Sequence, residues 1–151
     1  MSLYGKTIFG RACGDLKFSF NKEVTREPRV FYWRQALGLP WHLPSNAEWQ
    51  KLIDFVGNET AGAKLKATSG WNDYEGKSGN GTDDFGFSAL PGGVGSSGGG
   101  FYNVGYYGYW WSATEGIANR AFSRYMNYSS ADVNDHYYDK TDLYSVRCVQ
   151  D

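Results

Sequence analysis

Residues 116–144 mix large aromatic side chains with small polar and charged ones. Tyrosine and arginine supply contact area and hydrogen bonds at little loss of conformational entropy, while serine and asparagine adapt to different partners. This mixture is more typical of a contact surface than of a core, although a polar β surface without a partner is the alternative interpretation. The chemistry that these residue types support best is recognition, so we predict a binding site here.

Catalytic chemistry finds less support in the sequence. No nucleophile, base and orienting group stand at a recognisable spacing. His42 lies beside Trp41 just before a predicted helix, which favours a structural role. We therefore expect that the chain is not an enzyme.

Metal ligands are sparse. Cys13, Cys148 and the two histidines lie far apart, without the spacing of a zinc site. Asp83 and Asp84 offer the carboxylate oxygens that calcium prefers, but aspartates in a glycine-rich loop more often form turns. We expect no cofactor, and calcium is kept as an alternative.

Cys13 and Cys148 either form a disulfide between the two ends of the chain or are buried as reduced thiols.

The composition fits one domain, residues 1–151, long enough to bury a core without metals or disulfides. The net charge of −1 creates no strong attraction to nucleic acid or to an anionic membrane. No apolar run approaches the roughly 18 residues that span a bilayer, and no apolar signal-peptide core is visible at the start. We expect no nucleic-acid binding and no membrane insertion. The 20 glycines and 18% aromatic residues favour a loop-rich fold.

The clearest element that could position the binding segment is a helix within LPSNAEWQKLIDFVG. Ser45 is a good N-cap, Glu48 completes a capping box, and Gly57 supplies the stop. An apolar face at helical spacing comes from Trp49, Leu52, Ile53 and Val56. Residues 61–68 predict another short helix.

The remaining elements are shorter. Residues 3–10 and 15–20 look like strands, and residues 30–37 like a short helix. Residues 69–100 predict a long structured loop, in which we expect four side chains to be buried: Trp71, Phe85, Phe87 and Leu90.

Three strand-like segments complete the chain. Residues 101–111 are strand-like, and most of their aromatic side chains are assigned to the core, with a sugar-stacking platform as the alternative. After Asn119 the pattern alternates, so that Ala121 and Ser123 point one way and Phe122, Arg124 and Met126 the other. Residues 145–149 predict a final strand. The order of elements indicates a mixed α+β domain.

Several segments together resemble a known family: residues 41–52, 61–72, 80–93, 101–115 and 145–151. They are similar to the Fibrobacter succinogenes major paralogous domain, a bacterial family with a C-type-lectin-like fold related to the formylglycine-generating enzyme. The resemblance covers about residues 30–151, while residues 1–29 carry no matched motif. It implies an α+β, C-type-lectin-like domain with two or more short helices, small antiparallel sheets and long structured loops.

The cysteines depart from the family pattern. The family often has a cysteine just before the helix start, where this chain reads GLPWHLPS, so Cys13 is at most a substitute partner for Cys148. The two cysteines also lack the arrangement with which the formylglycine-generating enzyme performs copper chemistry. Trp71, Asn72 and Asp73 resemble a calcium-binding triplet of C-type lectins, but the partner triplet of that site is absent.

Residues 116–144 are similar to the variable region of proteins that diversity-generating retroelements mutate at adenines. Except for Met126 and Lys140, every residue type in this segment is reachable from asparagine codons by such mutagenesis. His136 lies in this segment, and a mutable position cannot carry fixed chemistry. The positions predicted to vary and to bind the ligand are Ile117, Arg120, Ser123, Tyr125, Ser129, Ser130, Asp132, Asp135, His136, Tyr137, Tyr138, Asp139, Asp142, Leu143 and Tyr144.

The resemblance thus implies a non-catalytic receptor- or adhesin-type module that binds varying, protein or cell-surface ligands. It implies a location on a phage virion or a bacterial cell surface. The alternative from another class is an undiversified, lectin-like adhesin domain that binds glycans, and a third reading is a structural surface domain without a ligand.

Overall fold

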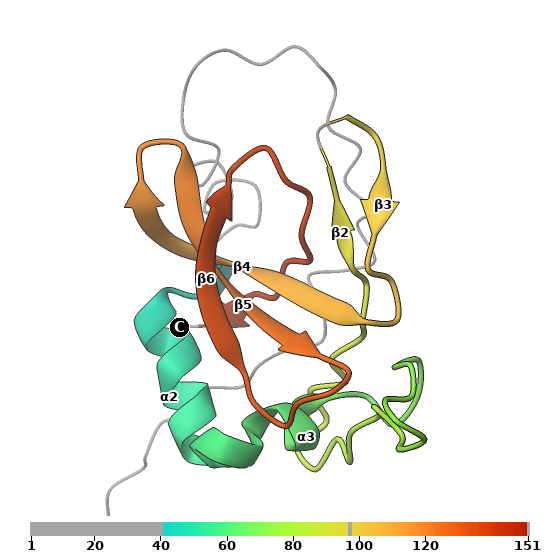
Figure 1. The fold of residues 1–151 in the computed structure, drawn as a ribbon. Helices are drawn as coiled ribbons and strands as arrows, with labels where there is room; N and C mark the ends of the chain where they lie inside the picture. The colour runs from blue at the N-terminus through green and yellow to red at the C-terminus, as the bar shows by residue number, and fades with distance from the viewer. Residues whose placement is uncertain (1–40, 97, 151) are drawn as a thin grey trace, which may run out of the picture.

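The computed structural model describes residues 41–96 and 98–150. Its helices and strands form a mixed α+β arrangement with small antiparallel sheets, which confirms the predicted class at that level (Figure 1). The predicted elements within residues 1–40, and Cys13, lie outside the described residues. The elements in chain order are β1 (Trp41–His42), α2 (Asn46–Val56), the 3-10 turn η2 (Asn58–Thr60), α3 (Ala61–Leu65), β2 (Val94–Gly95), β3 (Phe101–Tyr102), β4 (Tyr107–Ile117), β5 (Arg120–Asn127), β6 (Asn134–Asp139) and β7 (Val149–Gln150).

Helix α2 begins and ends as its sequence predicts. The Ser45 hydroxyl accepts from the Glu48 backbone N–H at 3.2 Å, and the Glu48 carboxylate accepts from the Ser45 backbone N–H at 2.8 Å. This capping box satisfies two donors that the first turn leaves without helical partners. His42 also bonds Glu48, with 2.7 Å between Nε2 and Oε1, in agreement with a structural role. Gly57, at φ 108°, ends the helix.

The main hydrophobic core lies where α2 and α3 meet the three-stranded sheet. The predicted apolar face of α2 is buried, and its Trp49 meets Phe87 edge-to-face at 6.0 Å. Phe87 in turn meets Trp110 of β4 at 6.3 Å, while Met126 of β5 is fully buried in the same cluster. Aromatic rings of this size dominate the burial energy of a small core. The core therefore joins α2 to one face of the sheet.

The three-stranded sheet has the order β4-β5-β6, and both strand pairs are antiparallel. Trp110 lies opposite Arg124, and Arg124 lies opposite Asp135 across the next pair. The β4–β5 register shifts near Glu115, where the ladder is irregular. Because side chains alternate between faces along a strand, the alternation predicted after Asn119 is confirmed.

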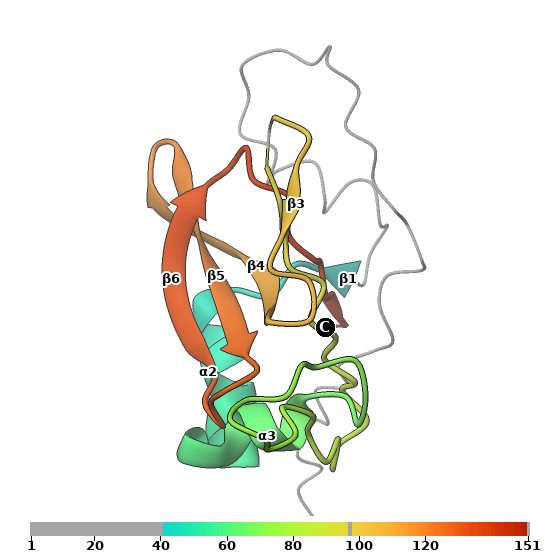
Figure 2. The same cartoon turned by 45° about the vertical axis from the view of Figure 1, so that its right-hand side comes forward.

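The two ends of the described chain meet in a second, two-stranded sheet. Trp41 pairs with Gln150 and His42 with Val149, and the two strands lie side by side next to the C-terminus (Figure 2). The strand predicted over residues 145–149 is therefore largely wrong. Ser145 makes only a bridge with Trp110, and Arg147 leaves the ladder to donate to the Phe87 carbonyl at 2.8 Å.

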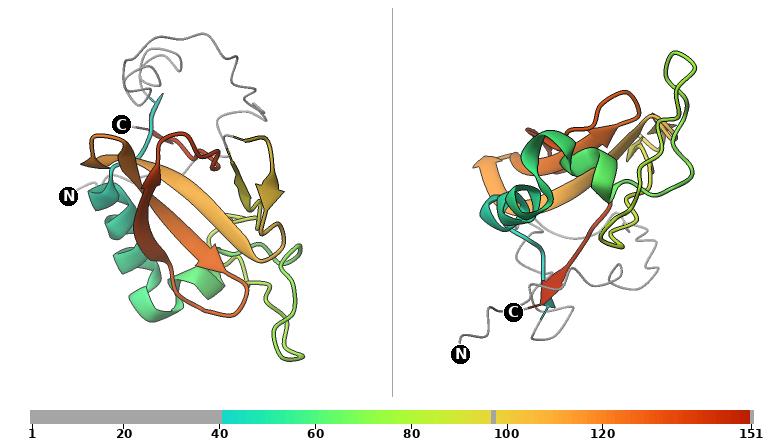
Figure 3. Two further views of the ribbon diagram at one scale, coloured as in Figure 1. Left: turned by 45° about the horizontal axis from the view of Figure 1, so that its top comes forward. Right: turned by 90° about the horizontal axis from the view of Figure 1, so that it is seen from below.

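The loop over residues 69–100 is structured, as predicted, but two of its four apolar side chains are not buried. Trp71 and Phe87 are in the core, whereas Phe85 and Leu90 are exposed. Phe85 instead packs edge-to-face on the exposed Phe55 ring of α2, at 5.7 Å. The short β2–β3 arm begins within this loop and lies beside β4, away from α2 (Figures 1 and 3).

Candidate binding surface

The two faces of the β4-β5-β6 sheet differ in what covers them. On one face, which we call the core face, Trp110, Arg124 and Met126 point toward α2. The opposite face carries the residues of the other alternation phase and is not packed against α2. We call it the aromatic face and define it by the rings of Tyr107, Tyr109, Trp111, Tyr125, His136, Tyr138 and Tyr144.

The rings of the aromatic face form a connected layer. Tyr109 lies at its centre, stacked on Tyr107 at 5.7 Å and on Tyr144 at 4.8 Å. Trp111 continues the stack, 4.5 Å from Tyr144. Tyr138 meets both Tyr109 and Tyr144 edge-to-face, at 5.8 and 5.4 Å. Offset stacks and edge-to-face pairs are the favourable geometries for aromatic rings, so these side chains hold each other in fixed positions.

The central ring of this layer is shielded from water while the surrounding rings remain accessible. Tyr109 is 8% exposed, and its burial raises the pKa of the hydroxyl to about 12. Tyr107, Trp111, Tyr125 and Tyr138 are half-buried, and His136 is exposed. A partly exposed layer of large rings on a sheet face resembles an interaction surface more than a core.

Ser123 lies on the aromatic face but is not accessible. Its side chain is fully buried, opposite Trp111 on β4 and His136 on β6. The prediction that Ser123 is a surface position is therefore wrong, because larger rings from neighbouring strands close over a small residue in the central strand. Among the described residues, its hydroxyl has no hydrogen-bond partner.

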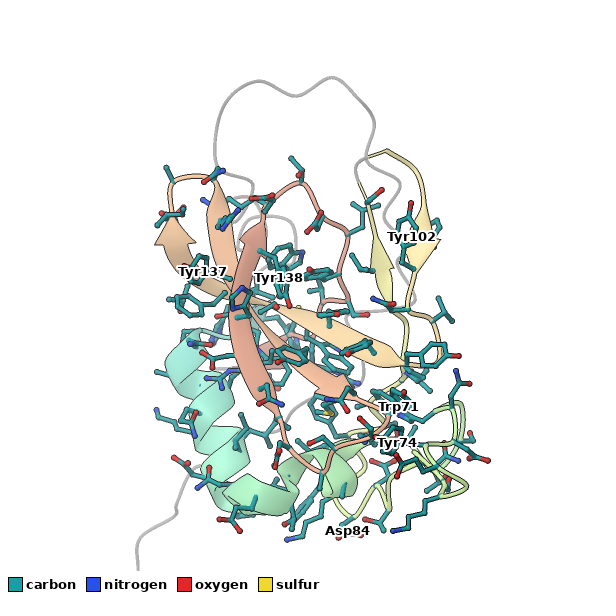
Figure 4. All side chains as sticks on the ribbon, in the orientation of Figure 1. Trp71, Tyr74, Asp84, Tyr102, Tyr137 and Tyr138 are labelled. Atoms are coloured by element: carbon teal, nitrogen blue, oxygen red, sulfur yellow. The ribbon has the colours of Figure 1, made fainter. Side chains whose placement is uncertain are left out.

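Tyr137 and Tyr138 are adjacent on β6 but belong to different surfaces (Figure 4). Tyr137 lies opposite Phe122 on the other alternation phase and meets that ring at 5.8 Å. Of the predicted ligand-binding residues Tyr137, Tyr138 and Tyr144, only Tyr138 and Tyr144 therefore belong to the aromatic face.

Ile117, Leu143 and Asp135 also lie apart from the aromatic face. Ile117 is exposed where β4 ends, and Leu143 makes a backbone bridge with Gly95 of β2. Asp135 accepts a hydrogen bond from the Asn46 amide of α2 at 3.3 Å. The Arg124 guanidinium, buried beside it, donates to the Asn46 side-chain and backbone oxygens at 3.1 and 3.2 Å.

Charged pairs line one edge of the sheet. Arg120 contacts Asp139 across the β5–β6 pair at 2.9 Å, and Lys140 contacts Glu115 at 2.5 Å. Asp142, just beyond β6, accepts a hydrogen bond from the Tyr144 hydroxyl. Burial, together with the nearby Asp139, raises the pKa of the Asp142 carboxyl above its usual range.

The residues predicted to vary between β5 and β6 lie at the other end of the sheet. Ser129, Ser130 and Asp132 form a loop whose side chains bond mainly to one another and to Asn127. Helix α3 approaches so closely that a Cβ at Gly62 would lie 2.4 Å from the Asp132 carbonyl oxygen. These three positions are therefore separate from the aromatic face.

Lys66 also contacts this loop. Its side chain is buried, at 3% exposure for the residue, and donates to the Ser130 carbonyl at 2.7 Å. The ammonium lies 4.9 Å from the centre of the Trp71 ring. Burial lowers the pKa of Lys66 to about 8. Lys66 and α3 thus contact the backbone of this loop. These contacts do not constrain the side chains of Ser129, Ser130 and Asp132.

The candidate calcium ligands have other roles in the structure. Asp83, at φ 50°, accepts from the Ser88 backbone N–H and hydroxyl, both at 2.6 Å, and so forms a turn. Trp71 is in the core, and its indole donates to the Ala89 carbonyl at 2.9 Å. Among the described residues, no group of three or more histidine, cysteine, aspartate or glutamate side chains could hold a metal ion.

Cys148 is buried next to β7, and the described residues include no free thiol. The candidate partner, Cys13, lies outside these residues, so the pairing stays a prediction.

Three members of the aromatic face, Tyr107, Tyr109 and Trp111, are not predicted from the sequence, because the interpretation of residues 101–111 assigns most of their aromatic side chains to the core. Of the aromatic residues from 101 to 111, only Tyr109 and Trp110 are buried, and Tyr109 is covered by other rings of the face. The signal was available in the run YGYWW, because Tyr107, Tyr109 and Trp111 share one phase and Gly108 and Trp110 share the other.

Comparison with known proteins gives one family. The model of the Fibrobacter succinogenes major domain matches residues 34–150. The chain belongs to this family. The match spans every described helix and strand, so the aromatic face lies on the family's own domain. No curated protein and no solved structure matches the chain. Within the described residues, no helix has the length and apolar character to cross a membrane.

Proposed function

We propose that the chain is a non-catalytic, receptor- or adhesin-type module that binds protein ligands through the aromatic face. The observation that carries this proposal is the connected layer of half-exposed rings on the sheet face opposite α2. Tyrosine and tryptophan are the residues that most often dominate binding energy at protein interfaces. Rings that already hold each other in place lose little entropy when a ligand binds, which favours affinity.

We further propose that a retroelement diversifies this surface on a C-type-lectin-like scaffold. Membership of the family and the mixed α+β layout with long structured loops support the proposed fold. Sheet hydrogen bonds are made by the backbone, so Tyr125, His136 and Tyr138 can change without loss of the β5–β6 ladder. The core face, with Trp110 and Met126, would remain constant between copies.

We propose a narrower set of ligand contacts than the set predicted from the sequence. Tyr125, His136, Tyr138 and Tyr144 would contact the ligand directly, and Asp139 and Asp142 would line its edge. Tyr107 and Trp111 would be constant contacts, because they lie outside residues 116–144. The buried Ser123 would tolerate only small replacements. A phage virion or a bacterial cell surface is the proposed location.

The gene neighbourhood tests the diversification directly. We expect a near-identical template repeat of the segment that encodes residues 116–144, differing at adenines and accompanied by a reverse transcriptase gene. Differences should cluster at codons for the outer phase, such as Tyr125 and Tyr138, and spare Met126. A neighbourhood with neither a repeat nor a reverse transcriptase would overturn this part of the proposal.

A glycan array tests the protein ligand against the lectin-like alternative. The purified chain is applied with and without a calcium chelator, beside the double variant Tyr138→Ser/Tyr144→Ser. We expect no sugar binding in any of these conditions. Chelator-sensitive sugar binding that survives in the double variant would instead support an undiversified glycan-binding domain.

A further inference from the structure

The edge of the aromatic face carries more negative than positive charge. Its carboxylates are Glu115, Asp139 and Asp142, and its cations are Arg120 and Lys140. Both cations are already engaged in ion pairs, with Asp139 and with Glu115. Among the described residues, Asp142 makes no ion pair. The one carboxylate at this edge without a cationic partner therefore lies directly beside the rings.

The surroundings of Asp142 combine the two groups that attract a cationic side chain. Tyr144 donates its hydroxyl to the Asp142 carboxylate, and the charge of Asp142 also acts on Tyr138. These two rings meet edge-to-face at 5.4 Å. A guanidinium or ammonium group is attracted to the face of an aromatic ring and to a carboxylate at the same time. Burial already destabilises the charged form of Asp142, and an incoming cation would relieve this.

We propose that the aromatic face binds a basic segment of a protein partner, whose arginine or lysine side chain lies against Tyr138 and Tyr144 and pairs with Asp142. This inference rests on the proposed binding function and specifies its partner. An acidic partner would meet like charge at Asp139 and Asp142. A wholly apolar partner would bury the Asp142 carboxylate without a counter-ion, which is strongly unfavourable.

The test uses a random 12-residue peptide library displayed on phage and panned on the full chain. We expect enriched peptides to contain arginine or lysine beside an apolar or aromatic residue. The best peptide is then synthesised twice, once as selected and once with each arginine replaced by the neutral isostere citrulline, or each lysine by norleucine. The neutral peptide should bind about tenfold more weakly, as expected for loss of a charge-assisted contact.

Variants of the protein assign the contact to its residues. Asp142→Asn should weaken the basic peptide about tenfold and leave the neutral peptide unchanged. Asp132→Asn, at the opposite end of the sheet, is the matched control and should change neither. Denaturation curves that match the original protein show that each variant is folded.

The outcomes separate this inference from the proposed function. Peptides that lose binding with Tyr138→Ser but carry no basic residue, or are insensitive to Asp142→Asn, would overturn the cationic partner and leave the binding face standing. Peptides insensitive to both Tyr138→Ser and Tyr144→Ser, or the absence of any enriched peptide, would overturn both.

Discussion

The core face and the aromatic face of the β4-β5-β6 sheet come from alternating residues of the same strands, yet they have different surroundings. On β4, Trp110 and Trp111 are neighbours in sequence, but Trp110 is 3% exposed in the core and Trp111 is half-buried among tyrosines. On β5, Met126 is fully buried in the core beneath α2, whereas the preceding Tyr125 packs on Tyr109 at 5.9 Å. Both faces are rich in aromatic rings, so composition alone does not distinguish them.

The two faces differ in what their side chains contact. Core-face side chains contact α2 and the loop that carries Phe87, so their shapes are fixed by surroundings on every side. The rings of the aromatic face contact mainly one another. A change there removes a part of the surface without removing a support of the fold. In the proposed function, the two-residue period of the strand thus separates the residues for stability from those for recognition.

The largest expected effect comes from the adjacent tryptophans. Trp110→Ala should lower the free energy of unfolding by about 3–5 kcal/mol, because it leaves a cavity beside Phe87. Trp111→Ala is the matched control and should lose clearly less, since its ring is only partly buried. Urea denaturation of both variants measures the difference, and equal losses would break the distinction between the faces.

The second-largest effect on stability is expected at the contact between α2 and the sheet. Asn46→Ala leaves the buried Arg124 guanidinium without its side-chain acceptor, which should lower the free energy of unfolding by about 1–3 kcal/mol. Gln50→Ala, at an exposed position of the same helix, should change it by less than about 0.5 kcal/mol. Thermal or urea denaturation distinguishes the two, and a neutral Asn46→Ala would show that Arg124 finds another partner.

The buried Lys66 should make the free energy of unfolding depend on pH. Because burial lowers its pKa from 10.5 to about 8, the folded chain holds fewer protons than the unfolded chain between these values. Stability should therefore rise with pH from about 8 toward 10, by no more than about 1.4 kcal/mol per pH unit. Above pH 10 the opposite contribution of Tyr109, whose pKa is raised to about 12, begins.

The rise should disappear in Lys66→Met, measured by urea denaturation at intervals between pH 7.5 and 9.5. Lys64→Met serves as the matched control: it removes a neighbouring lysine, whose ammonium donates to the Val56 carbonyl at 2.8 Å, and the slope should persist in this variant. The same slope in Lys66→Met as in the original protein would refute the assignment to Lys66.

The smallest effect concerns two buried serines. Ser112→Ala removes a hydroxyl that accepts from the Thr114 backbone N–H at 3.1 Å, so it should lower the free energy of unfolding by about 1 kcal/mol. Ser123→Ala removes a buried hydroxyl that has no hydrogen-bond partner within residues 41–96 and 98–150, so the free energy of unfolding should be unchanged or higher. Loss of stability in Ser123→Ala comparable to that in Ser112→Ala would show that the Ser123 hydroxyl is satisfied.

Local patterns in the sequence predict the local structure well. The capping box of Ser45 and Glu48 and the stop at Gly57 predict α2 because both signals act within a few residues of the helix ends. The alternation from Ala121 to Met126 predicts the two faces of β5 for the same reason. Both depend only on backbone geometry and nearby side chains.

The rest of the surface depends on contacts between distant segments. Tyr144 completes the aromatic face by stacking on Tyr109 and Trp111, and no local pattern in the sequence indicates these contacts. Ser123 is buried because rings from β4 and β6 close over it. The division between Tyr137 and Tyr138 follows from the register of β6, which is set by pairing with β5 rather than by composition.

A binding scan of the sheet residues tests the central claim most directly. One phage-selected peptide is titrated against a series of single serine variants that are shown by denaturation to be folded. We predict that Tyr125→Ser, Tyr138→Ser and Tyr144→Ser each weaken binding about tenfold or more, while Ile117→Ser and Tyr137→Ser leave it within about threefold. If Tyr137→Ser abolishes binding and the aromatic-face variants bind normally, the aromatic face is not the recognition surface.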